Sequence, residues 1–243
     1  MKIKDQVTQH VIDGLEAGSP PWIRDWSDDG TKSTLCLAPR NGDSQRPYSG
    51  INWLILGMFS PYKSNEWFTA IRLTGNKKPI SSEEWKKGFT IIFYKEISFE
   101  DKNGEEQFRP IMRTYRVWNR EQIPDLPQIK RTSKFDPKSS VDEMLVNLKL
   151  KGGVHVGGDR ACYVPSEDAI CIPNDDAFNT PDAATSTKAH EGCHATGAEH
   201  RLKRKLSTSD ETSYAYEELI AELGSAMVCA SLGIPLEKLR HTD

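Results

Sequence analysis

The pentapeptide His190-Glu191-Gly192-Cys193-His194 constrains the fold of this chain more than any other stretch of its sequence. On an α-helix, two histidines four residues apart lie one turn above each other, so both imidazoles can bind a single zinc ion. The glutamate after the first histidine then stands where a general base for a metal-activated water is needed. The motif therefore predicts a helix over these residues that carries a hydrolytic metal site.

The residues around this motif support two neighbouring helices. Thr180-Pro181-Asp182 has the composition of a helix start, with proline at the first helical position, and Gly197 offers a C-cap for the helix that holds the motif. A second helix is predicted from about Tyr214 to Leu232. It carries several glutamates and thus a possible further ligand.

A catalytic zinc site has three protein ligands and one open position, and the sequence offers two candidates for the third ligand. Read literally, His190 to His200 spells HExxHxxGxxH, the pattern of zincins in which a third histidine follows a glycine turn. In the other interpretation Glu218 completes the site, and Glu222, one turn later, orients a histidine by accepting its N–H. His200 heads a basic run and has no separate methionine-containing turn after it, so Glu218 is favoured.

Charge and proline content divide the chain into two parts. Residues 1–138 contain 22 Lys and Arg against 18 Asp and Glu, whereas the remaining residues contain 10 against 17. The segment IPDLPQIKRTSKFDPKSS, with three prolines and no periodicity, has the composition of a linker. We expect an α+β protein with a small mixed α/β domain over residues 1–125, a linker over 126–140 and a second domain over 141–243.

Local patterns place the expected elements of both domains. In the first domain, they are helices over residues 5–17 and 51–59 and strands over residues 90–95 and 109–119, with Asn103-Gly104 as a hairpin signal. In the second, a helix over residues 141–150 and a strand pair over 161–164 and 169–172 precede the motif.

The mildly basic first domain has the composition of a single-strand-binding module. Bases stack on flat side chains while cations follow the phosphates, so aromatic residues interleaved with lysines favour this function. A tryptophan in a small domain is more often part of the core, and lysines often form an ordinary solvated face. The candidate DNA-binding residues are Trp22, Trp26, Asn52, Trp53, Trp67, Lys77, Lys78, Lys86 and Lys87.

Several classes of protein are excluded by composition. No apolar run approaches the roughly 18 residues that a membrane span requires, and the N-terminus lacks the apolar segment of a signal peptide. Five cysteines without CxxC spacing argue against a disulfide framework and indicate reduced thiols, with Cys193 as a small core filler. We expect a soluble, cytosolic protein without membrane contacts.

The chain resembles the ArdC-type antirestriction proteins of plasmids and phages, which are related to the N-terminal part of TraC conjugative primases. The resemblance covers nearly the whole chain and is far more specific than the HExxH motif alone. It rests on ordered matches at residues 15–18, Pro21, Trp22, Trp26, 46–52, 67–69, 117–122, 157–161, Tyr163, Asp168, Ile170, Pro173, the HExxH motif, Thr196-Gly197, Arg201-Leu202 and 217–224.

This resemblance implies a single-stranded-DNA-binding N-terminal domain and a C-terminal zincin-like metallopeptidase domain in the cytoplasm of a bacterial host cell. The implied cofactor is Zn²⁺ or another divalent metal, and the implied partners are single-stranded DNA and a protein or peptide substrate such as a restriction component. From its family position, Tyr163 is a candidate for stabilising the oxyanion, with His155 as the alternative. The implied function is protection of incoming DNA from host restriction. The other hypothesis is a non-enzymatic protector with a structural or vestigial zinc site, although Glu191 favours the peptidase.

Overall fold

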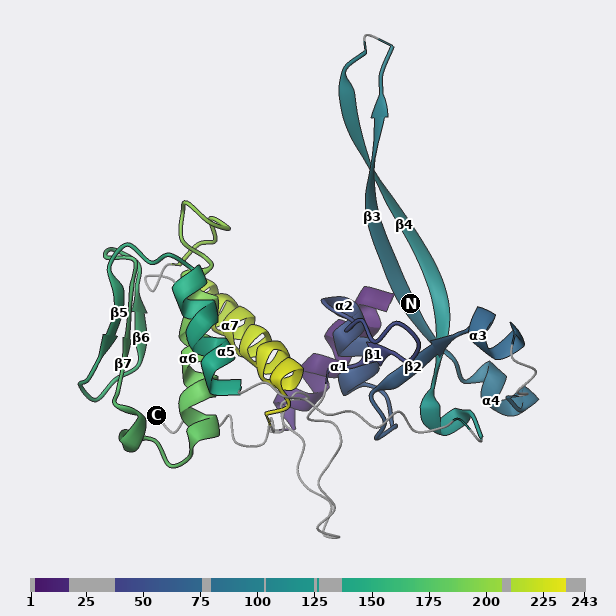
Figure 1. The fold of residues 1–243 in the computed structure, drawn as a ribbon, viewed down its shortest axis with the longest axis horizontal. Coiled ribbons are helices and arrows are strands. Elements are labelled where there is room, and N and C mark those ends of the chain that lie inside the picture. The colour runs from purple at the N-terminus through teal and green to yellow at the C-terminus, as the bar shows by residue number, and fades with distance from the viewer. Residues whose placement is uncertain are drawn as a thin grey trace. The chain divides into compact units, whose positions relative to one another are not determined.

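A computed structural model describes residues 3–17, 38–75, 80–102, 104–124, 126, 137–206 and 211–234 of the chain (Figure 1). The chain folds into two compact units, one of residues 1–13 and 38–129 and the other of residues 14–37 and 130–243. Both helices and sheets are present, as expected for a two-domain α+β protein. Among the DNA-binding candidates, Trp22, Trp26, Lys77 and Lys78 lie outside the described residues.

The first unit is built on a four-stranded sheet in the order β1-β2-β4-β3. Only β1 and β2 are parallel, and the other neighbours are antiparallel. Helix α1 (Ile3–Glu16) belongs to this unit as far as Asp13. The other elements are β1 (Arg40–Asn41), α2 (Ile51–Trp53) with a π-helical turn (Leu54–Met58), β2 (Glu66–Thr69), α3 (Ala70–Gly75), α4 (Ser82–Lys86), β3 (Phe89–Glu100), β4 (Glu106–Asn119) and a 3₁₀ turn (Arg120–Gln122).

The core of this unit contains two of the tryptophans that were expected to contact DNA. Trp67 is fully buried, with its ring edge-on to Tyr62 and Phe89 at centroid distances of 5.9 and 5.3 Å, and Trp53 is 3% exposed. A base cannot stack on a ring whose faces are covered by other side chains. This corrects the expectation for Trp53 and Trp67, whose large apolar surfaces stabilise the sheet instead.

The remaining described DNA-binding candidates have different surroundings. Asn52 is half-buried and ties α2 to β3, because its side chain accepts from the amide of Ile92 at 2.8 Å and donates to the carbonyl of the same residue at 2.6 Å. Lys86 and Lys87 are exposed. Lys87 forms an ion pair with Glu84 at 2.6 Å. Asn52 therefore has a structural role, while the two lysines face solvent.

Strands β3 and β4 form a long hairpin that leaves the sheet and extends well beyond it (Figure 1). Only Val117, Trp118 and Asn119 of β4 pair with β2, so most of the hairpin is a two-stranded ribbon. The strands are longer than the predicted segments 90–95 and 109–119, because the pairing continues toward the turn to Glu100 and Glu106.

The second unit packs three helices with a three-stranded sheet in the order β5-β7-β6. β5 lies parallel and β6 antiparallel to the central strand β7. The elements are α5 (Pro137–Asn147), β5 (Gly153–Val156), β6 (Cys162–Val164), β7 (Ala169–Ile172), a 3₁₀ turn (Asp175–Ala177), α6 (Pro181–Ala195) and α7 (Glu211–Leu232). The last four residues of the predicted linker, 137–140, belong to α5.

The core of the second unit joins α5, α6 and β7. Leu145, Ile170, Ile172 and Ala195 are buried in one cluster, which fixes the sheet against the helix that carries the HExxH motif. Of the helices that the structure describes, none has the length and apolar character needed to cross a bilayer.

Candidate metal centre

The N-terminal cap of helix α6 and its close packing against α7 fix the orientation of His190 and His194. The Thr180 side chain accepts a hydrogen bond from the amide of Ala183, which caps the helix start, and Pro181 occupies its first turn. A Cβ atom on Gly224 of α7 would lie 2.7 Å from Sγ of Cys193, so α6 and α7 approach closely where these residues meet. Cys193 thus fills space between the helices, as the sequence suggested.

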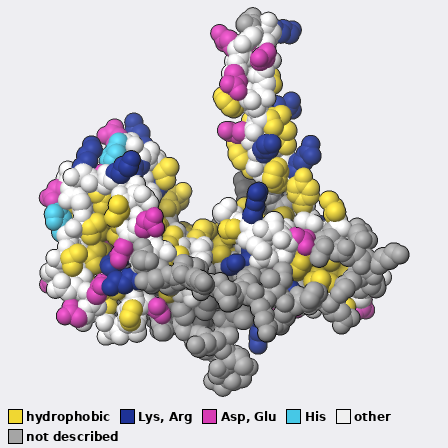
Figure 2. All heavy atoms as spheres, viewed as in Figure 1, with side chains coloured by type: hydrophobic (Ala, Val, Ile, Leu, Met, Phe, Trp, Pro, Cys, Tyr) yellow, Lys and Arg dark blue, Asp and Glu magenta, His cyan; other side chains and the backbone are white. Residues whose placement is uncertain are grey.

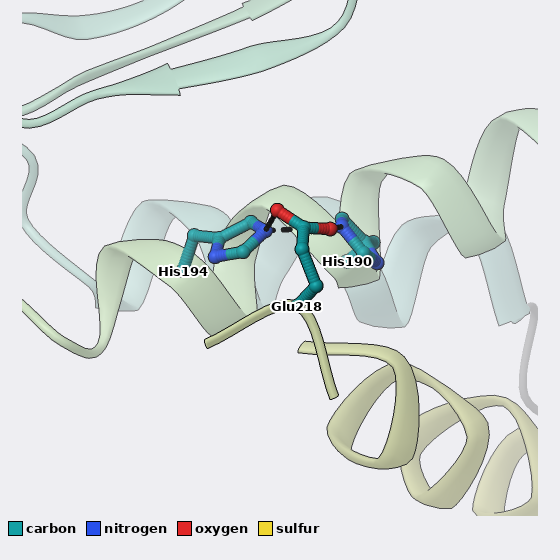
Figure 3. Close-up of side chains that lie close together, drawn as sticks. All are labelled: His190, His194 and Glu218. Carbon is teal, nitrogen blue, oxygen red and sulfur yellow. Dashed lines mark hydrogen bonds and ion pairs between the residues drawn. The ribbon is translucent and has the colours of Figure 1, made fainter. Parts of the chain in front are cut away.

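Three potential ligands meet between α6 and α7 (Figure 3). Nε2 of His190 and Nε2 of His194 are 3.0 Å apart. Oε2 of Glu218 lies 3.5 Å from Nε2 of His190, and Oε1 of the same carboxylate lies 3.4 Å from Nε2 of His194. The structure therefore brings together the two motif histidines and the glutamate that the sequence favoured as their partner.

This donor set fits a divalent cation. Ligand atoms held about 2.0–2.2 Å from a tetrahedral ion are separated from one another by roughly 3.4 Å. The two imidazole nitrogens are 3.0 Å apart, and each has a different oxygen of Glu218 within 3.5 Å. Two neutral imidazoles and one carboxylate also match the His₂Glu composition of catalytic zinc sites. The side chains of His190, His194 and Glu218 can therefore hold such an ion with little rearrangement.

A second carboxylate, which the sequence analysis did not single out, stands behind His194. Oε1 of Glu217 lies 3.3 Å from Nδ1 of this histidine. Arg204 donates to both oxygens of Glu217, at 2.8 and 3.0 Å, and all three side chains are largely buried. An acceptor at Nδ1 fixes the tautomer in which Nε2 is free to bind a cation.

Glu222 is the residue predicted to orient a histidine. Its Oε1 lies 3.6 Å from Nδ1 of His190, beyond normal hydrogen-bond distance but within range of electrostatic attraction. Burial, together with the neighbouring carboxylate of Glu218, raises the pKa of Glu222. Both histidines therefore have a carboxylate at Nδ1, and the closer one belongs to His194.

Glu191 is buried beside the cluster, and the edge strand β6 reaches it. Burial raises the pKa of its carboxyl to about 7, an effect that the backbone amide of Tyr163 opposes by hydrogen bonding and Glu218 reinforces by its charge. A carboxyl group whose pKa lies near neutrality can both accept and return a proton. Glu191 thus has the properties of a general base that can also act as an acid.

The Tyr163 side chain is directed to a different cluster. Its hydroxyl donates to Oδ1 of Asp168 at 2.9 Å, and burial raises its pKa to about 12. Arg201 donates to both oxygens of Asp168 at 2.7 and 3.1 Å. Burial opposes the ionisation of Asp168, but Arg201, the amide of Lys151 and the tyrosine hydroxyl hold its pKa well below the usual range.

His200, the alternative third ligand, also belongs to this Asp168 cluster. Its Nε2 lies 3.3 Å from Oδ2 of Asp168, and the backbone bonds from Leu202 to Thr196 and from Arg204 to Gly197 fold the chain back after α6. His200 is not in the group formed by His190, His194 and Glu218. His155, the other oxyanion candidate, is exposed on β5.

A histidine pair on one helix with a glutamate from the next defines a zincin-like arrangement, and comparisons with known proteins agree. A family model described as a zincin-like metallopeptidase matches residues 140–243. A model of the N-terminal domain of the anti-restriction factor ArdC matches residues 1–118. Both halves of the chain are therefore assigned to known domain families.

Comparisons over the whole chain find both domains together in single known proteins. The metal-free crystal structure of antirestriction protein ArdC from plasmid R388 has a TM-score of 0.67 and 32% identity, covering 94% of this chain and 81% of that one. Its Mn(II)-bound structure has a TM-score of 0.69 and 30% identity, covering 96% and 82%. DNA primase TraC of Escherichia coli is 30% identical over 98% of this chain but only 24% of its own length. The chain belongs to the ArdC family of antirestriction proteins.

Proposed function

We propose that this protein is a metal-dependent peptidase joined to a single-stranded-DNA-binding domain, and that it protects incoming plasmid or phage DNA from restriction in the bacterial cytoplasm. The observation that carries the proposal is the convergence of His190, His194 and Glu218 beside the buried carboxyl of Glu191. A site that only stabilises the fold has no need of a buried base next to its ligands.

In the proposed reaction, His190, His194 and Glu218 hold a divalent cation, which we expect to be zinc. When bound, the cation supplies Lewis acidity that polarises the scissile carbonyl and makes water a better nucleophile. Glu191, buried beside these ligands, accepts a proton from the attacking water and delivers it to the departing amine.

Other groups of the chain position the metal ligands and Glu191 without touching the peptide. Arg204 holds Glu217 against His194, and the backbone amide of Tyr163 holds Glu191. We assign Tyr163 a positioning role through this amide, because its hydroxyl is engaged by Asp168. Glu222 supplies a second negative charge near His190.

The DNA-binding half of the proposal is supported by the match to the ArdC N-terminal domain and by the net positive charge of residues 1–138. Binding to the strand that enters the cell would concentrate the peptidase where restriction enzymes act. The substrate class that we propose is therefore a protein on or near incoming DNA, such as a restriction component.

The decisive variant is Glu191→Gln, which keeps the shape of the side chain and removes its ability to take up a proton. We expect loss of peptide hydrolysis and of protection when an unmodified plasmid enters a restricting host, with metal content and single-strand binding unchanged. If protection survives while hydrolysis is lost, the peptidase is not the antirestriction activity, and the non-enzymatic protector becomes the better description.

A further inference from the structure

The β3–β4 hairpin has two faces of different chemistry. In the antiparallel register, Phe93 pairs with Arg113 and Ile97 with Arg109, so each pair joins two odd-numbered residues. Side chains alternate between the faces of a ribbon, which places odd-numbered residues of both strands on one face and even-numbered residues on the other. We call these the odd face and the even face.

Cations and acidic residues separate between these faces. The odd face carries Lys95, Arg109 and Arg113. From Phe89 to Phe99 and from Gln107 to Val117, all of which the structure describes, it contains no Asp or Glu.

The even face has the opposite character. It carries Glu96, Glu100 and Glu106, and Arg116 is its only cation. Arg116 donates to the carbonyls of Lys86 and Gly88 at 2.7 and 3.0 Å, which turns its guanidinium toward the base of the hairpin. The positive charge that is available to a ligand therefore lies on the odd face.

Aromatic rings are interleaved with the cations of the odd face. Phe93, Phe99 and Tyr115 are 46%, 47% and 44% exposed, and Phe93 meets Tyr115 edge-on at a centroid distance of 6.1 Å. Half-buried Ile97 and Ile111 continue the apolar surface between them. Hydrophobic and basic side chains follow each other along the hairpin in Figure 2, while acidic ones gather toward its tip.

We propose that the odd face of the β3–β4 hairpin is the surface that binds single-stranded DNA, with bases stacked on Phe93, Phe99 and Tyr115 and phosphates contacted by Lys95, Arg109 and Arg113. This inference rests on the proposed function, because it names the surface through which the first domain holds DNA. A face with cations and no carboxylate complements a polyanion, and open aromatic rings favour unpaired bases over a duplex whose bases already stack on each other. Among the candidate tryptophans that the structure describes, Trp53 and Trp67 are buried and do not compete with the hairpin for this role.

Matched double variants of the full-length protein test the aromatic contribution. Phe93→Ala/Phe99→Ala removes two exposed rings from the odd face, and the control Tyr94→Ala/Phe108→Ala removes two from the even face, where the rings are 60% and 64% exposed. With a fluorescein-labelled 20-nucleotide strand and anisotropy as the readout, we expect the odd-face variant to bind at least about tenfold more weakly. The even-face variant is expected to bind within about twofold of the parent protein.

A charge variant gives an independent readout. Arg109→Gln/Arg113→Gln should reduce the dependence of log affinity on log salt by about 1.4, since each phosphate contact on a single strand contributes about 0.7. Thermal unfolding of each variant checks that the hairpin change leaves the fold intact.

The possible outcomes separate the inference from the proposed function. If the parent protein binds the strand and both double aromatic variants bind equally well or equally poorly, the odd face is not the DNA surface, although the domain still binds DNA. Preference for duplex over single strand would also overturn the inference, because the exposed rings would then not be stacking on unpaired bases. If the parent protein does not bind single strands at all, the proposed function itself fails.

Discussion

The helix pair α6–α7 and the β3–β4 hairpin use charged side chains in opposite ways. At the helix pair, the charges are buried and paired: Arg204 holds Glu217, and Glu217 lies against His194. On the odd face of the hairpin the cations are exposed and have no carboxylate beside them. Removing a buried partner leaves an uncompensated charge, whereas removing an exposed charge affects mainly what binds there. The two regions should therefore respond very differently to single substitutions.

The largest effect is expected from Asp168→Asn, a buried and paired charge that lies outside the helix pair but in the same unit. Asp168 is buried, joins Arg201, Tyr163 and the Lys151 amide, and has a positive φ of 51°, a conformation that asparagine also accepts. The variant thus changes charge with little backbone strain, and we expect a loss of about 3 kcal/mol in the free energy of unfolding. Urea denaturation of the metal-free protein measures it. The control Glu199→Gln breaks an exposed pair with Lys203 and should cost less than about 1 kcal/mol.

Acid titration checks the same carboxylate. The pKa of Asp168 is lower in the folded than in the unfolded state, so its contribution is complete above the unfolded value of about 4 and is lost as the pH falls toward the folded value. The stability difference between the parent protein and Asp168→Asn should therefore shrink as the pH is lowered below 4. A difference that stays constant over this range would show that the ionised carboxylate of Asp168 is not its source.

The next largest effect is expected on metal affinity, when a metal ligand is removed. Glu218→Ala should weaken zinc or manganese binding by more than about 100-fold, as measured by competition with a chromophoric chelator. This loss exceeds the one expected from removing a residue that only hydrogen-bonds a ligand. His200→Ala should retain the affinity of the parent protein, because His200 lies at Asp168. If His200→Ala lost the metal and Glu218→Ala kept it, His200 would be the third ligand, and Glu218 would not bind the metal.

The carboxylate behind His194 should have an intermediate effect. Glu217→Gln keeps the size of the side chain but removes the charge at Nδ1 of the histidine, so we expect metal affinity to fall by about 10 to 100-fold. Glu222→Gln, with its oxygen 3.6 Å from the other histidine, should cause a smaller loss in the same chelator assay. Equal losses would mean that distance at Nδ1 does not decide the contribution of these carboxylates.

The smallest effect on the free energy of unfolding is expected from substitutions on the odd face of the hairpin. Arg109→Gln/Arg113→Gln should change the free energy of unfolding by no more than about 0.5 kcal/mol, since both side chains are exposed and the strands keep their backbone pairing. A large destabilisation in urea would show that these cations stabilise the ribbon and would remove the contrast with the helix pair.

The sequence predicted the parts of this molecule that depend on local periodicity. Spacing of four placed His190 and His194 on one face, and the start of α6 and the end of α7 lie within one residue of the predicted positions. The preference for Glu218 over His200 agrees with the cluster that the structure forms, although its role as a ligand stays a prediction.

Features that depend on how elements meet could not be predicted. Glu217 and Glu218 are adjacent in sequence, and the rotation of α7 decides that one faces Nδ1 and the other Nε2 of the same histidine. The contribution of Arg204 depends on how the chain folds back after α6. The burial of Trp67 and the length of the ribbon likewise follow from tertiary packing, which overrides a composition argument based on aromatic and basic residues.

The two middle residues of the HExxH motif carry a lesson for protein design. A Cβ atom on Gly192 would lie 2.9 Å from Met144 and 3.0 Å from Leu145 of α5, and Cys193 occupies the space left by Gly224 of α7. These positions, which a sequence pattern treats as free, set the distances between three helices. A designer who transplants His-Glu-x-x-His into another helical scaffold must therefore choose the two x residues by the neighbours they will touch, and redesign position 224 together with position 193.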